Sequence, residues 1–227
     1  MRSRRFLVML KLVRWTMTIV PIALLGGVLS SIAVAQAPFE TLPKVLDASM
    51  PRDQQISLAL SAGPKEVTNN ATVYVLGQKG YEIARQGTNG ASCLVERHFV
   101  KPDETTIEPT CYDPEGSRTL LQVDLYEAEL RAKGTSEADI KKEVANGYKD
   151  GRFKAPSKPG VEYMLSSDNR LGPTADHGTF HFPPHFMFYA PYITGKDLGY
   201  ASVAPFLVDP GKPDARMVVV PDPKLYK

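Results

Sequence analysis

Apolar and polar positions follow three different patterns along this chain, and the first is a long apolar run near the N-terminus. Residues 16–35 are rich in Ile, Val, Leu and Ala, and no acidic residue precedes Glu40. The basic residues of this region are Arg2, Arg4, Arg5, Lys11 and Arg14. A basic segment, an apolar run and a small-x-small end at Ala33-Val34-Ala35 are typical of a secretory signal peptide. We predict a signal peptide over residues 1–35. The alternative is an uncleaved membrane anchor, because about 20 apolar residues can span a bilayer.

The second pattern, a strand-like one, begins after the apolar run. Residues 71–76, 81–86 and 91–98 are rich in β-branched and aromatic side chains. Turn-forming residues separate them at 77–80 and 87–90, and the Asn-Gly pair of the second turn tolerates the positive φ of hairpins. We therefore predict a three-stranded antiparallel meander.

The third strand of this meander carries one of the chain's two cysteines. Alternation places Cys93 and Val95 on one face, and Leu94 and Glu96 on the other. Cys93 and Cys111 form an even set in a compartment that permits oxidation, and we predict that they are bridged. The alternative is a catalytic thiol.

The third pattern is helical periodicity in three segments. The sequence predicts helices within residues 49–63, 117–134 and 136–151, with Ser117 and Ser136 as the N-caps of the second and third. A spacer rich in Pro and Lys follows the third helix.

Extended segments return in the C-terminal third. We predict a strand over 161–166, an apolar strand over 185–190 that is buried on both faces, and a hairpin of 206–208 with 217–220. Strands followed by helices and strands again indicate an α+β fold, with a mainly antiparallel sheet and about three helices. We expect residues 36–227 to form a single domain.

Charge limits the classes of partner. The whole chain has 27 basic and 25 acidic residues, and five of the basic ones lie in the predicted signal peptide. The remainder is slightly acidic and has no Lys/Arg stripe, which argues against nucleic-acid binding. Membrane contact is expected only through the signal segment, if that segment stays uncleaved. The predicted localisation is periplasmic or secreted.

Three segments resemble exported bacterial proteins of no assigned function. The resemblance rests on Arg85-Gln86-Gly87-Thr88-Asn89-Gly90-Ala91-Ser92-Cys93-Leu94-Val95, on Tyr163-Met164-Leu165-Ser166 and on Pro184-His185-Phe186-Met187. It implies a shared fold and export, and it brings no catalytic residues with it.

No familiar catalytic or nucleotide-binding motif occurs, so the histidines are the main candidates for chemistry. His177, His181 and His185 are equally spaced, and imidazole is a common metal ligand. Pro183-Pro184 excludes a regular helix between the last two. On a strand, neighbouring histidines of the set would lie about 13 Å apart. Only a curled loop could bring all three histidines to one metal ion. We therefore expect no cofactor, and a metal ion bound by these histidines is kept as an alternative. The alternative is that these histidines pair with backbone or water.

Further candidates come from single residues and from the aromatic content. His185 is the histidine most suited to a catalytic role, because it begins a strand after a loop. Arg85, Arg97 and His98 are candidates for ligand binding. Six aromatic side chains gather between residues 180 and 192, and we expect them in the core, with a ligand pocket as the alternative: Phe180, Phe182, Phe186, Phe188, Tyr189 and Tyr192.

These observations leave three hypotheses of function. The preferred one is a non-enzymatic envelope protein that binds a small molecule or another protein. The alternatives are a metal-dependent or histidine-based hydrolase, and a structural or assembly protein.

Overall fold

The computed structural model describes residues 50–96, 106–171, 180–199 and 206–221. All of them belong to one compact unit, Leu42–Lys227, and the predicted signal segment lies outside the described residues. Within these ranges no helix is both long and apolar enough to cross a membrane.

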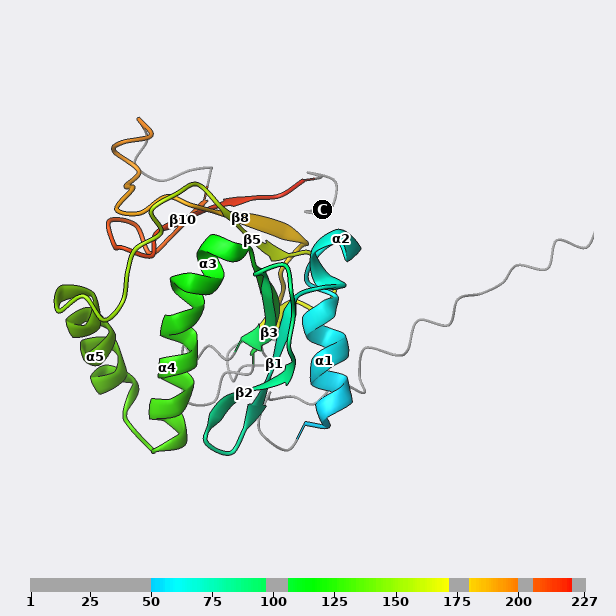
Figure 1. Cartoon of the computed structure of the whole chain (residues 1–227). Coiled ribbons are helices and arrows are strands. Elements are labelled where there is room, and N and C mark those ends of the chain that lie inside the picture. Colours follow the sequence, from blue (N-terminus) through cyan, green and yellow to red (C-terminus); the bar gives the residue numbers. More distant parts are fainter. Residues whose placement is uncertain (1–49, 97–105, 172–179, 200–205, 222–227) are drawn as a thin grey trace, which may run out of the picture. The chain divides into compact units, whose positions relative to one another are not determined.

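Helices and a mixed, mostly antiparallel sheet confirm the α+β class (Figure 1). Eight strands form the main path of the sheet, in the spatial order β2 (Gly80–Arg85), β1 (Thr72–Gly77), β3 (Ser92–Glu96), β4 (Thr106–Tyr112), β5 (Val161–Met164), β8 (His185–Tyr189), β10 (Arg216–Val219) and β9 (Phe206–Val208). Two short strands, β6 (Arg170–Leu171) and β7 (Phe180–His181), extend from β4. The predicted hairpin of β9 with β10 is confirmed.

The predicted meander is wrong in its order, although its three strands exist. β1 lies in the middle and runs parallel to β3, so β2 and β3 are not neighbours. β1 is the most apolar of the three and is almost wholly buried, whereas β2 has polar, exposed positions that suit an edge strand. The 87–90 segment reverses the chain as expected, but it crosses the start of β1. Gly87 permits the crossing, because a Cβ there would lie 2.2 Å from the Thr72 nitrogen.

Helices α1 (Arg52–Leu60), α4 (Leu120–Ala132) and α5 (Glu137–Lys149) are the three predicted ones. Two short helices, α2 (Lys65–Thr68) and α3 (Pro114–Arg118), were not expected. Ser117 is not an N-cap, because α3 begins earlier and the Asp113 carboxylate accepts from the Gly116 N–H. Ser136 caps α5 as predicted, accepting from the Asp139 N–H.

Helices cover both faces of the N-terminal half of the sheet (Figure 1). The face under α1 holds a core cluster that includes Leu58, Ala59, Val73, Val95 and Ile107. The other face packs against α4 through Leu94, Tyr112, Leu120, Leu121 and Tyr189. These clusters define an α1 face and an α4 face of the sheet.

The disulfide between Cys93 and Cys111 is confirmed. The two residues are opposite each other on the antiparallel strands β3 and β4, on the α1 face. The predicted alternation is also confirmed, since Cys93 and Val95 join the α1-face core while Leu94 joins the α4-face core.

Candidate functional site

Acidic, phenolic and basic side chains lie inside the α4 face of the sheet. Strand register places Glu96 on β3, Tyr112 on β4, Glu162 on β5 and Arg216 on β10 on this one face. Glu96 is 2% exposed, Tyr112 and Glu162 are 0% exposed, and Arg216 is 9% exposed. Because an isolated charge is costly to bury, these groups must satisfy one another.

Tyr112 is the central hydroxyl of this cluster. Its phenol oxygen contacts the Glu96 carboxylate and lies 2.7 Å from Asp124 Oδ2 on α4. Burial raises the pKa of Tyr112 well above its ordinary value, and the charges of Asp124, Glu162 and Glu96 raise it further. The phenol therefore keeps its proton throughout the physiological pH range.

Glu162 and Arg216 form a buried ion pair. Arg216 Nη1 lies 2.6 Å from Glu162 Oε2, and the two side chains are 10% and 0% exposed. Burial by itself would lower the pKa of Arg216, but the charges of Glu162, Tyr112 and Glu96 together with the hydrogen bond to Glu162 outweigh it and hold that pKa well above the ordinary value. The guanidinium is thus a permanent cation inside the fold.

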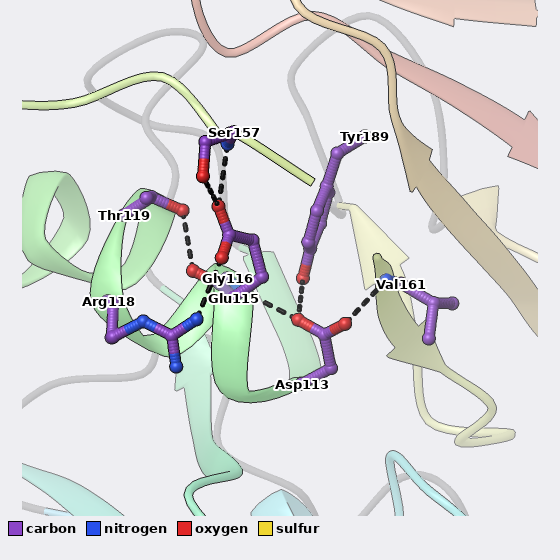
Figure 2. Close-up of polar contacts among 8 residues, drawn as sticks. All are labelled: Asp113, Glu115, Gly116, Arg118, Thr119, Ser157, Val161 and Tyr189. Carbon is purple, nitrogen blue, oxygen red and sulfur yellow. Dashed lines mark hydrogen bonds and ion pairs between the residues drawn. The ribbon is translucent and has the colours of Figure 1, made fainter. Parts of the chain in front are cut away.

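Asp113 joins three elements at the edge of this cluster (Figure 2). Its Oδ1 accepts from the Gly116 N–H at 2.8 Å and from the Tyr189 hydroxyl at 3.2 Å. Its Oδ2 accepts from the Val161 N–H at 3.1 Å. One carboxylate therefore ties the start of α3 to β5 and β8.

Glu115, two residues after Asp113 and within α3, makes a similar connection (Figure 2). Its Oε1 accepts from the Ser157 N–H at 2.6 Å and from the Ser157 hydroxyl at 3.0 Å, while Arg118 donates to Oε2 at 2.8 Å. The Ser157 N–H lowers the pKa of this carboxyl. Glu115 thereby fixes the Pro- and Lys-rich spacer against α3.

Tyr148 on α5 and Asp214 before β10 are near this network. The Tyr148 hydroxyl, Asp214 Oδ1 and Arg216 Nε are buried and make no hydrogen bond within the part of the chain that the structure describes. Burial, followed by the charge of Asp209, raises the pKa of Asp214. Apart from Tyr148 and Asp214, the ionisable groups described above are bonded to one another or to the backbone, which is an arrangement that fixes elements in place.

His185 lies on the same α4 face, at the start of β8, and is 7% exposed. Its Nδ1 is 2.8 Å from the Pro183 carbonyl oxygen, so the Nδ1–H donates to the backbone. This is the backbone-paired state expected as the alternative to a catalytic histidine, and the catalytic role stays a prediction. Burial lowers the pKa of His185, so the folded protein favours the neutral ring.

We expect His185→Gln to lower the free energy of unfolding by about 1 kcal/mol at neutral pH, through loss of one buried hydrogen bond. The folded pKa is below the unfolded value of about 6.5, so the contribution of the neutral ring is complete above that pH and is lost as the pH falls. Melting temperatures measured from about pH 8 to pH 5 should fall more for the parent than for His185→Gln. Parallel curves would contradict this assignment.

The other histidine candidates are only partly described. His181 lies on β7, exposed and opposite Arg170 of β6, while His177 and His98 lie outside the described residues. Within the described ranges, no group of three or more His, Cys, Asp or Glu side chains is placed to hold a metal ion. The three-histidine hypothesis is therefore not decided by this structure.

Arg85 binds backbone. Its guanidinium donates to the Thr68 carbonyl at 2.6 Å and to the Ala71 carbonyl at 3.0 Å, which fastens the end of α2 to the start of β1. Arg97, the second arginine candidate, lies outside the described residues. The structure does not bring Arg85 to the polar cluster around Tyr112.

The C-terminal half of the α1 face carries apolar side chains that the described elements cover only in part, with Tyr163 packed against the edge of the α1-face core. Register places seven of them on one face of β5, β8, β10 and β9: Val161, Tyr163, Phe186, Phe188, Met217, Val219 and Leu207. Phe188 is 41% exposed and Val219 is 40% exposed, and the other five are partly exposed. We call these seven residues the open sheet surface.

The expectation that six aromatic residues form core is wrong for most of them. Only Tyr189 is buried, while Phe180 is 59% and Tyr192 is 60% exposed, and Phe188 belongs to the open sheet surface. The prediction that the 185–190 strand is buried on both faces is wrong for the same reason. Helix α1 reaches as far as β4, and no helix of the described residues lies over the α1 face of the later strands.

The sequence analysis did not predict the buried polar cluster around Tyr112. One feature of the sequence could have revealed part of it. Alternation puts Glu96 on the same face as Leu94, and a carboxylate beside a core leucine requires a partner. Glu162 and Arg216 give no local signal, because they are 54 residues apart and meet only through the order of the strands.

Comparison of the chain with protein-family models, with curated proteins and with solved structures gives no match.

Proposed function

We propose that the protein is an exported, non-enzymatic binding module that docks a partner protein through the open sheet surface. The observation that carries the proposal is the row of seven apolar side chains across four strands, with Phe188 and Val219 each about two-fifths exposed. Contiguous exposed apolar surface of this kind marks sites of protein association in soluble domains.

The chemistry of the surface favours a protein over a small molecule. Small ligands occupy concave sites with a few converging polar groups. The open sheet surface is the face of a sheet, and the Tyr163 hydroxyl is the only oxygen or nitrogen atom among its seven side chains. A partner protein with an apolar surface of its own would pack face to face against the open sheet surface.

The internal polar groups support a binding role over catalysis. A general acid or base needs a pKa near the working pH and reach to a substrate. Tyr112 and Arg216 have pKa values held far above that range, and Glu162 is wholly buried and paired with Arg216. The basic N-terminal segment with its apolar run and the disulfide support export.

Photocrosslinking from the surface itself tests the proposal. Benzoylphenylalanine in place of Phe188 keeps an aromatic ring at the site, and irradiation of intact cells that naturally make the protein should give one discrete protein adduct. The same amino acid in place of Lys142, an exposed residue of α5, is the control and should give none. An adduct of twice the chain mass would identify a second copy as the partner.

Val219→Asp, combined with the crosslinker at position 188, should abolish the adduct, because a carboxylate cannot be desolvated against an apolar partner without cost. Val219 is partly exposed, so the melting temperature should change little. Docking would be disproved by an adduct that persists in this variant, by no adduct at all, or by a lipid or small-molecule adduct.

A further inference from the structure

The open sheet surface consists of two rows of side chains that cross the strands. Register aligns the first row over all four strands, from β5 through β8 and β10 to β9: Val161, Phe188, Met217 and Leu207. The second row covers the first three of these strands: Tyr163, Phe186 and Val219. Neighbouring strands lie about 4.8 Å apart, and residues two apart on one strand lie about 7 Å apart. Each strand therefore adds one position to a row, and the rows are about 7 Å from each other.

The aromatic rings of these rows continue the apolar layer that begins under α1. Tyr163 packs against the edge of the α1-face core, and its ring centroid lies 5.8 Å from that of Phe186. The Phe186 ring is in turn 6.4 Å from the Phe188 ring. One apolar face thus extends from the half of the sheet that α1 covers to the half that no described helix covers (Figure 1). A helix is the element that already covers the first half.

We infer that the partner contributes an amphipathic α-helix of about three turns, which lies across β5, β8, β10 and β9 and continues the layer that α1 begins. This inference rests on the proposed function and names the partner element that the surface binds. An α-helix advances about 5.4 Å per turn, close to the spacing of about 4.8 Å between strands, so each turn meets one strand. Apolar side chains at positions i, i+4, i+7 and i+11 of the partner helix would face the four strands in turn.

The size of the surface favours a single helix over a second copy of the chain. Four strands and two rows, with their side chains, occupy roughly 20 Å by 15 Å, or about 300 Å². A stable dimer buries about 800 Å² on each partner, well above this area. Three helical turns are about 16 Å long and about 10 Å wide, which matches the surface in both directions.

The edge of the sheet argues against the addition of a partner strand. The Ala190 N–H donates to the Ala215 carbonyl, so alternation turns the backbone groups of Arg216 and Val218 toward β9. Their partners are the last and first residues of β9, which leaves Leu207 as the one residue of this strand whose N–H and C=O point outward. An edge this short offers a partner strand little to pair with. The partner is therefore expected on the face of the sheet.

Mapping of crosslinks along the first row tests the inference. Benzoylphenylalanine is placed singly at each position of that row in cells that naturally make the protein, and mass spectrometry identifies the partner residue joined to each. The four partner residues should lie in one segment and advance by three or four positions from each strand to the next. An extended segment rises about 3.3 Å per residue and would advance by only one or two.

The outcomes separate this inference from the proposed function. An advance of one or two, sites scattered along the partner sequence, or sites on the open sheet surface of a second copy would overturn the helix and leave docking in place. Absence of an adduct from all four positions would remove the docking proposal and the helix with it.

A synthetic peptide of the crosslinked segment gives a second readout with the purified protein. Its circular dichroism should become more helical on binding, and Val219→Asp should weaken binding about tenfold or more, because the carboxylate would be desolvated against an apolar helix. Ile83→Asp is the matched control, since Ile83 is 48% exposed on β2 and lies outside the open sheet surface. Equal weakening by the two substitutions, or binding with no gain of helix, would contradict the inference.

Discussion

Gly116→Ala is expected to lower the free energy of unfolding by about 3 kcal/mol, in the range measured for overpacked cores. A Cβ at this position would lie 2.0 Å from the Tyr189 hydroxyl oxygen and 2.8 Å from Tyr112 Cδ1. Both rings belong to the α4-face core, and the Tyr189 hydroxyl donates to Asp113. The Tyr189 ring cannot move without disturbing its hydrogen bond to Asp113, which Figure 2 shows, and the Tyr112 ring cannot move without disturbing its contacts with Glu96 and Asp124.

Gly77→Ala is the matched control. Its Cβ would meet its nearest neighbours at 3.5 Å, an ordinary contact, and its backbone does not have a positive φ. Urea unfolding should place this variant within about 1 kcal/mol of the parent. Adding Tyr189→Phe to Gly116→Ala should recover part of the loss, because it removes the closest clashing atom. Equal effects of the two glycine substitutions would show that the seam between α3 and β8 is not tightly packed.

The sequence predicts most elements of this fold because each rests on local chemistry. Ser136 begins α5 and Gly134 ends the preceding helix with a φ of 78°, as expected from capping preferences. The pairing of Cys93 with Cys111 was expected from the even number of cysteines and from the prediction of export. The two helix ends depend on neighbours within one or two turns of chain, and the cysteine pairing depends only on there being two cysteines.

Strand order could not be predicted in the same way. A loop that reverses the chain looks the same whether the next strand lies beside β2 or beyond β1, and burial of β1 on both sides decides between them. The exposure of Phe188 is also nonlocal, since it depends on how far α1 extends over the sheet. The candidate docking surface was therefore mistaken for core, and the resemblance to exported proteins stays a prediction.

The second large effect is expected from Arg216→Met, which keeps the length of the side chain and removes its charge. Glu162, which is 0% exposed, would then be left without its cation. Breaking a buried ion pair by removing one partner costs about 3 to 5 kcal/mol, because the remaining charge stays desolvated. Urea unfolding at neutral pH should show a loss of this size. Adding Glu162→Gln should restore part of it by removing the buried negative charge that Arg216 neutralises.

Arg52→Met provides a control of equal chemistry and different burial. Arg52 and Glu82 are also 2.6 Å apart, but their side chains are 48% and 61% exposed, so the loss should be below about 1 kcal/mol.

The two variants should also differ in their pH dependence. Without Arg216, the buried Glu162 carboxylate binds a proton more readily in the folded state than in the unfolded chain, where Glu titrates at about pH 4. The deficit of Arg216→Met should therefore shrink as the pH is lowered from 7 to about 5, while that of Arg52→Met stays small throughout. If the two arginines cost the same at pH 7, or if the deficit of Arg216→Met grows toward acid pH, then the Glu162 carboxylate is not held in the core by Arg216.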